Sequence, residues 1–182
     1  MDMPQHKSWE ITGPDVAAEL LSWINVTPED CQLLGSLYER AKERSMTFAQ
    51  DFAGRILAAE QTAEYIAPYP LDVLAKTLAN WFIELFSGTY DLAYAEARIR
   101  IGQVHVRLGL PVRYPIAMFD LVTRHGEQVA AAGGQTAVEA FRKILSLDIA
   151  VFSQAYEENQ LTHLANVMGN ERLARMLLMK EL

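Results

Sequence analysis

The stretch IRIGQVHVRLGLP, residues 99–111, places a single histidine, His105, among apolar and basic residues and ends on a proline. In a helix, three apolar residues share the face of this histidine: Ile101, Val104 and Leu108. The imidazole is therefore expected in apolar surroundings, where an unpaired polar group costs about 1–3 kcal/mol. One ring nitrogen can bond the Ile101 carbonyl four residues back, which leaves the other free to hold a metal. Two interpretations stay open, a core histidine with a satisfied hydrogen bond or the ligand of a metal-bearing cofactor.

The composition narrows the class of protein. With 182 residues, of which 51% are hydrophobic and 21% charged, the chain is expected to fold as one domain with a substantial core. The net charge of −7 argues against nucleic acid as a partner, because phosphate contacts need a basic face. Cys31 is the single cysteine, which excludes an internal disulfide and favours a cytoplasmic setting. No signal-peptide pattern and no apolar run near the ~20 residues that span a bilayer occur, so no membrane partner is expected.

Helical spacing of apolar residues runs through almost the whole sequence, and strand signals are nearly absent. Thr27 is expected to cap a helix, with Pro28 in its first turn and Asp30 completing a capping box. Proline and glycine clusters separate the remaining helices. The expected helices cover residues 13–26, 27–45, 46–66, 71–86, 92–111, 112–134 and 136–182. In the last of them only Gly169 interrupts the pattern. We therefore predict an all-α bundle of about eight helices.

The motifs of common enzyme classes are missing. The sequence contains no P-loop, no dinucleotide-binding glycine pattern and no H-E-x-x-H, so we assign no catalytic residue. The four histidines stand apart from one another, which argues against a closed zinc site of about four ligands. We interpret His125 and His163 as surface or interface residues.

The segment YAEARIRIGQVHVRLGLPVRY, residues 94–114, resembles the proximal segment of the globin-coupled sensors and protoglobins. Their pattern is I-G-x-x-H-x-R-x-G-L-P followed by an aromatic residue. Upstream, LANWFIELFSGTYDLAYAEARIRIG at 78–102 resembles the E helix and E–F corner of the family. LLGSLYERAKERSMTFAQDFAGRIL at 33–57 is similar to its A and B helices. The resemblance covers about residues 25–160 and implies a globin fold with an extra N-terminal helix and a long C-terminal helix.

The resemblance implies three parts of the chain. Residues 1–24 would form an N-terminal extension with a short extra helix, 25–160 a sensor globin domain, and 161–182 a helical linker toward an output domain. The implied function is gas sensing rather than catalysis, with the ligation state passed on to that output domain. Two alternatives stay open: a stand-alone protoglobin-like haem protein that acts on NO or peroxide, and a haem-free globin-like signalling domain.

The resemblance also implies a cofactor and partners. Haem b would be held by His105 as the only protein ligand of its iron, and the gas would be O₂, NO or CO. A homodimer would form through the last two helices, at about residues 113–131 and 136–160. The second of these helices carries more apolar surface than one haem pocket needs, which we expect at the interface. These apolar residues are Val138, Phe141, Leu145, Phe152 and Tyr156.

The haem pocket implied by the resemblance lies around His105. Its expected lining is Phe52, Ala53, Leu74, Thr77, Leu78, Trp81, Ile101, Val104, Leu108, Tyr114 and Phe119. Ala53 departs from the family pattern, which has a ligand-binding tyrosine there, and Pro115 stands where a second aromatic often follows. Thr77 and Trp81 are then the only nearby donors, so we expect a mostly apolar pocket that favours CO and NO over O₂. Four arginines are candidates for the haem propionates, with none favoured: Arg98, Arg100, Arg107 and Arg113.

Overall fold

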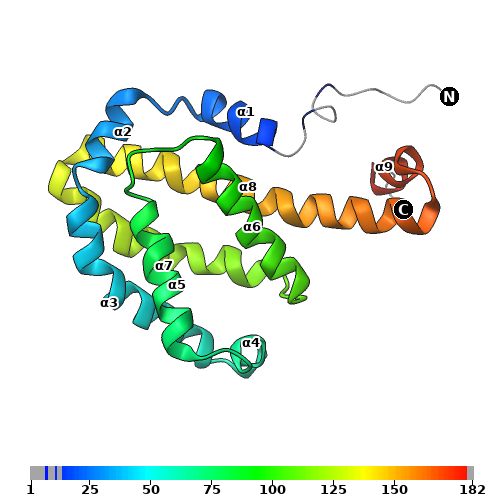
Figure 1. Cartoon of the computed structure of the whole chain (residues 1–182), viewed down its shortest axis with the longest axis horizontal. Helices are drawn as coiled ribbons and strands as arrows, with labels where there is room; N and C mark the ends of the chain where they lie inside the picture. The colour runs from blue at the N-terminus through cyan, green and yellow to red at the C-terminus, as the bar shows by residue number, and fades with distance from the viewer. Residues whose placement is uncertain (1–6, 8–10, 12–13, 180–182) are drawn as a thin grey trace.

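The computed structural model describes residues 7, 11 and 14–179, and within these residues it contains nine α-helices and no strand. The helices are α1 (Pro14–Ile24), α2 (Pro28–Gly35), α3 (Tyr38–Leu57), α4 (Glu60–Ile66), α5 (Leu71–Glu84), α6 (Leu92–Arg107), α7 (Arg113–Ala130), α8 (Gln135–Met168) and α9 (Glu171–Met179). Figure 1 shows α8 running along the length of the molecule, with the other helices grouped mostly around its first half. The predicted all-α fold is confirmed. Among the helices so described, none combines the length and apolarity that a membrane crossing needs.

Side-chain caps fix where two helices begin. Thr27 Oγ1 accepts a hydrogen bond from the Asp30 amide at 3.1 Å, and Asp30 Oδ2 accepts one from the Thr27 amide at 2.9 Å. The predicted capping box of α2 is therefore confirmed. Asp91 caps α6, because its Oδ1 accepts from the Tyr94 amide at 3.0 Å. This cap starts the helix that carries His105.

The helix boundaries between residues 27 and 66 differ from the prediction, because the structure divides this segment after Gly35 and again after Leu57, where α3 ends before α4. The sequence predicts a new helix from Met46, but α3 runs from Tyr38 to Leu57 without a break. A continuous buried stripe explains this, and its residues are Ala41, Ser45, Phe48 and Ala49. The break falls earlier, after Gly35, where α2 closely approaches the loop between α5 and α6. A Cβ on Gly88 of that loop would lie 3.0 Å from the Gly35 Cα, and Gly88 has a positive φ of 72°.

Aromatic rings form the centre of the core. Phe48 of α3 stacks on Phe82 of α5 with ring centroids 4.4 Å apart. Phe86, just after α5, stacks on Phe141 of α8 at 5.3 Å. All four side chains are fully buried. These contacts join α3 and α5 to the first half of α8 and close the core on that side.

The apolar residues of α8 that we expected at a dimer interface lie in the chain's own core. Four of the five are buried, namely Val138, Phe141, Leu145 and Phe152. Tyr156 is half-buried, and its hydroxyl donates to the Leu110 carbonyl at 3.0 Å. Periodicity identified a buried face, but helices α1, α2, α6 and α7 of the same chain cover it. The expectation for these residues was wrong, and the homodimer stays a prediction.

His125 is buried, contrary to the prediction, with 2% of its surface exposed. Its Nδ1 accepts from Arg44 Nε at 3.1 Å, so the proton is on Nε2, which donates to Asp51 Oδ2 at 3.0 Å. Both partners belong to α3, and His125 therefore ties α7 to that helix. His163 is exposed, as predicted.

Helix α8 does not continue to the C-terminus. It ends at Met168, and Gly169 reverses the chain with a φ of 65°. Figure 1 shows α9 folded back beside the outer end of α8, and Ala174 is fully buried there. The domain boundaries at residues 24 and 160 stay predictions, and the ends of the outer parts, 1–6 and 180–182, lie outside the described residues.

Candidate functional site

His105 lies near the end of α6 with one ring nitrogen already engaged. Its Nδ1 is 2.8 Å from the Ile101 carbonyl oxygen, the bond that the sequence suggests. A carbonyl can only accept, so Nδ1 carries the proton and Nε2 keeps a free lone pair. Burial lowers the pKa of His105, partly offset by the bond to Ile101, and the ring is therefore neutral near pH 7. A neutral imidazole with one free nitrogen is the form that ligates a metal.

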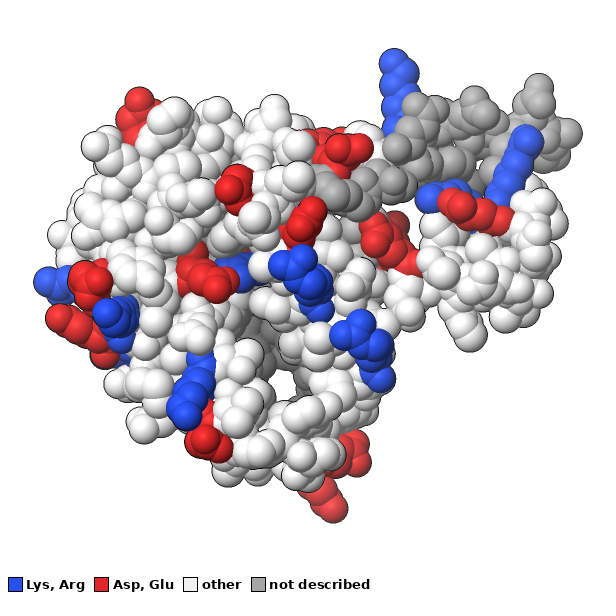
Figure 2. All heavy atoms as spheres, viewed as in Figure 1, with Lys and Arg blue, Asp and Glu red and all other residues white. Residues whose placement is uncertain are grey.

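The helix that carries His105 stands off from its neighbours on one side. Helix α6 packs mainly on α8 and α1 rather than on α5 or α7. Figure 2 shows a hollow in this part of the molecule, between the α4–α5 region and the C-terminal end of α6. Most of the residues predicted to line the pocket are only half-buried: Phe52, Ala53, Leu74, Leu78, Trp81, Ile101, Leu108, Tyr114 and Phe119. Thr77 and Val104 are exposed. Apolar side chains that the chain leaves half-covered suit a flat, apolar group.

Three predicted residues from different helices meet in one wall. The indole of Trp81 on α5 lies edge-on to Phe52 of α3, with ring centroids 6.3 Å apart. The indole also makes a T-shaped contact with Phe119 of α7, with ring centroids 6.2 Å apart. We call Phe52, Trp81 and Phe119 the aromatic wall. It connects the helices that face α6 across the hollow.

Both predicted donors near this wall are engaged elsewhere. The Thr77 hydroxyl donates to the Val73 carbonyl at 2.9 Å, within its own helix. Trp81 Nε1 donates to Asp148 Oδ2 of α8 at 3.0 Å. Ala53 and Leu78 have no donor to offer. The side of the hollow opposite α6 therefore presents no free donor from these four residues.

A buried polar network lies behind the aromatic wall, and sequence reasoning missed it. Asp148 and Arg98 are each 2% exposed, and Arg98 Nε lies 3.0 Å from Asp148 Oδ2. Arg98 Nη1 also donates to Glu84 Oε2 at 2.6 Å. The Tyr94 hydroxyl donates to Asp148 Oδ1. The signal was an aspartate inside the apolar run ILSLDIAVF at residues 144–152, a placement that usually requires buried partners.

Of the four arginine candidates for haem propionates, Arg98 is therefore buried in the core and paired with Asp148 and Glu84. Arg100 is exposed and lies 3.7 Å from Glu96 of its own helix. Arg113 lies over the ring of Tyr114, 4.6 Å from its centroid.

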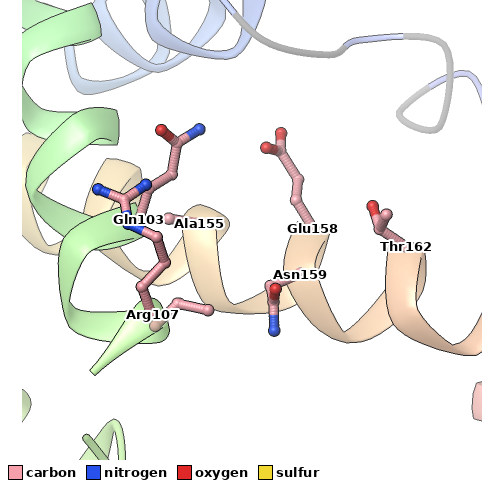
Figure 3. A pocket seen from close by; sticks show the side chains of 7 residues that line it. Gln103, Arg107, Ala155, Glu158, Asn159 and Thr162 are labelled. Carbon is pink, nitrogen blue, oxygen red and sulfur yellow. The ribbon is translucent and has the colours of Figure 1, made fainter. Parts of the chain in front are cut away.

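Arg107 lines a separate polar groove of about 250 Å³ between α6 and the outer half of α8, shown in Figure 3. The other lining residues are Gln103, Val106, Ala155, Glu158, Asn159 and Thr162. No residue of the predicted pocket lines this groove. Across the described part of the chain, no three His, Cys, Asp or Glu side chains gather as a metal site.

Comparison with known proteins agrees with this architecture. The family model described as Protoglobin matches residues 15–162. Among solved structures, the globin domain of the Geobacter sulfurreducens globin-coupled sensor is similar, with a TM-score of 0.72 and 29% sequence identity. That match covers 76% of this chain and 96% of the other. No curated protein matches the chain. The globin fold inferred from the sequence is confirmed.

Proposed function

The chain belongs to the protoglobin family, and on that premise we propose that it is a haem-based sensor domain for a diatomic gas. The observation that carries the proposal is the His105 imidazole, whose Nδ1 is bound to Ile101 and whose Nε2 is free, on the end of α6 that borders the hollow. Haem, when bound, supplies an iron that takes up O₂, NO or CO. Haem b fits best, because covalent attachment needs a C-x-x-C-H motif and Cys31 is the single cysteine.

In this proposal the α6 side of the hollow binds the haem iron and the opposite side shields the pocket from water. His105 Nε2 is the protein ligand of the iron, and Ile101 holds the imidazole in the orientation that this requires. The aromatic wall of α3, α5 and α7 covers the opposite side and excludes water. His125 is not assigned to the iron, since both of its ring nitrogens are bonded within the chain.

The test is His105→Ala, with His163→Ala as the matched control at an exposed site. We expect the His105 variant to fold but to lose most of its haem absorbance, and added imidazole to restore it. The control should keep full haem occupancy. Full haem retention and an unchanged ferrous spectrum in His105→Ala would refute the assignment.

We further propose that the sensor favours CO and NO over O₂. Bound O₂ carries partial negative charge and gains from a nearby donor, whereas CO is nearly neutral and gains less. Ala53 and Leu78 offer no donor, and the hydroxyl of Thr77 and the indole N–H of Trp81 are bonded within the chain. This absence of a free donor among the four supports the proposed preference.

The proposed route of the signal runs from α6 to α8. The His105 ring lies edge-on to Phe152 of α8, with centroids 5.2 Å apart. Three residues away on α6, Gly102 lets the two backbones approach closely, because a Cβ there would lie 2.6 Å from the Ala155 Cβ. A shift of His105 is therefore passed directly to α8, which would carry it to an output domain.

A homodimer through α7 and α8 completes the proposal. Its support is the family resemblance and the outward face of α8, which the chain covers only in part. Ser146 is exposed on that face, and Ala150 and Ser153 are half-buried along it. Small side chains of this kind permit close packing of a second copy.

A further inference from the structure

Asp148 is a carboxylate placed in the core of α8, where an unpaired charge would be very costly. Both of its oxygens are occupied. Oδ1 accepts from the Tyr94 hydroxyl, and Oδ2 accepts from Trp81 Nε1 at 3.0 Å and faces Arg98 Nε at 3.0 Å. Burial and the Asp148 charge raise the pKa of Tyr94 well above its ordinary value, so the phenol keeps its proton and donates.

Trp81 links this carboxylate to the hollow. The N–H of its indole points to Asp148 in the core, while the indole ring makes T-shaped contacts with Phe52 and Phe119 of the aromatic wall. The indole N–H is a donor only, and when buried it needs an acceptor. Asp148, which is buried in the core, supplies that acceptor.

A contribution to the stability of the fold is not sufficient to explain why this buried polar network is present. Apolar replacements of similar volume often leave stability unchanged or raise it. What the network does fix is geometry, because the charged acceptor decides which way the indole N–H points. With the acceptor gone, the N–H would need another partner, and a gas ligand bound in the hollow has accepting capacity.

We infer that Asp148 is a positioning residue that determines gas specificity, because it holds the Trp81 N–H toward the core and keeps the pocket free of a donor. This inference rests on the proposed function. It also means that α8 contacts both sides of the pocket, through Phe152 at His105 and through Asp148 at the aromatic wall.

The first measurement is hydrogen exchange of the Trp81 indole by NMR, with Trp81→Phe to assign its resonance. Asp148→Leu keeps the approximate shape of the side chain without either oxygen, and Arg98 keeps Glu84 as its counter-ion, so this variant is expected to fold. Because Asp148→Leu removes the acceptor of the indole N–H, exchange of the indole proton should speed up about tenfold or more. Glu84→Gln is the control, since it alters the network at its exposed end without touching Trp81, and exchange should stay slow.

The second measurement is O₂ dissociation from the haem-loaded protein. Asp148→Leu combined with Arg98→Met and Tyr94→Phe removes the network as one apolar set and leaves the indole N–H without an acceptor in the core. We expect O₂ dissociation to slow about fivefold, which corresponds to ~1 kcal/mol at 1.4 kcal/mol per tenfold. The same set in a Trp81→Phe background should show no slowing.

Two results would overturn the inference. One is indole exchange that stays slow in Asp148→Leu, which would mean that Asp148 does not hold the N–H. The other is an unchanged or faster O₂ dissociation in the triple variant. Indole exchange is also measured without haem, so a failure of haem binding would refute the proposed function while the exchange rate still decides the role of Asp148.

Discussion

Replacing Gly102 with alanine tests the contact between α6 and α8. The new Cβ would lie 2.6 Å from the Ala155 Cβ and 3.1 Å from the Phe152 carbonyl oxygen. Non-bonded carbons pack at about 3.5–4.0 Å, so the two helices would have to separate by about 1 Å. Overpacking of this kind costs ~1–3 kcal/mol, whereas alanine in a helix interior gains ~1 kcal/mol over glycine. We expect a net loss of ~0–2 kcal/mol in the free energy of unfolding.

Gly54 provides the matched control. It lies inside α3, and a Cβ there would meet no atom within 4 Å. Gly54→Ala should therefore show the helical gain alone, about 0.5–1 kcal/mol. In urea unfolding, the free energy of unfolding of Gly102→Ala should be lower than that of Gly54→Ala by ~1–3 kcal/mol. Equal stabilities would refute the close contact, and with it the proposed route from His105 to α8.

The remaining predictions concern gas binding, pH and assembly. Ala53→Tyr should slow O₂ dissociation by about 5- to 100-fold, because one added hydrogen bond contributes ~1–3 kcal/mol. An unchanged dissociation rate in stopped-flow measurements would contradict a donor-free pocket. Burial and Arg44 lower the pKa of His125, so the folded chain binds fewer protons than the unfolded one. Neutral His125 therefore contributes fully to the free energy of unfolding above about pH 6.5, and this contribution is lost as the pH falls. Urea unfolding at several pH values should show this loss. The free energy of unfolding should fall less steeply with pH in His125→Gln. Sedimentation of the unmodified chain should give a dimer, and a monomer would contradict the proposal. Ser146→Lys should dissociate the dimer, whereas Thr47→Lys, at an exposed site of α3, should leave it intact.

Local features were predictable because their partners lie close in the sequence. The bond between His105 and Ile101 spans four residues, and the capping box spans from Thr27 to Asp30. Helical geometry alone brings such pairs together. The proximal motif then identified the globin fold, which the comparisons confirm.

The buried polar groups were not predictable because their partners are remote. His125 meets Asp51 across 74 residues, and Asp148 meets Trp81 across 67. No local pattern records which distant side chain will satisfy a polar group. The same limit explains the apolar face of α8, since periodicity marks a face such as that of Phe141 as buried but does not say which element covers it.

The length of α8 has a mechanical consequence. The helix contacts α6 at Ala155 and continues to Met168, which adds about 20 Å at 1.5 Å per residue. If this segment of α8 is rigid, a small tilt at Ala155 gives a larger displacement at Met168. A tilt of about 3° moves the end of the helix by about 1 Å. Displacements of about 1–2 Å are the size that helices use at allosteric interfaces. Helix α9, folded back on this outer segment in Figure 1, would travel with the tip. In the proposed function, a lever of this length would let the globin core report an event at His105 by changing only the direction of one helix.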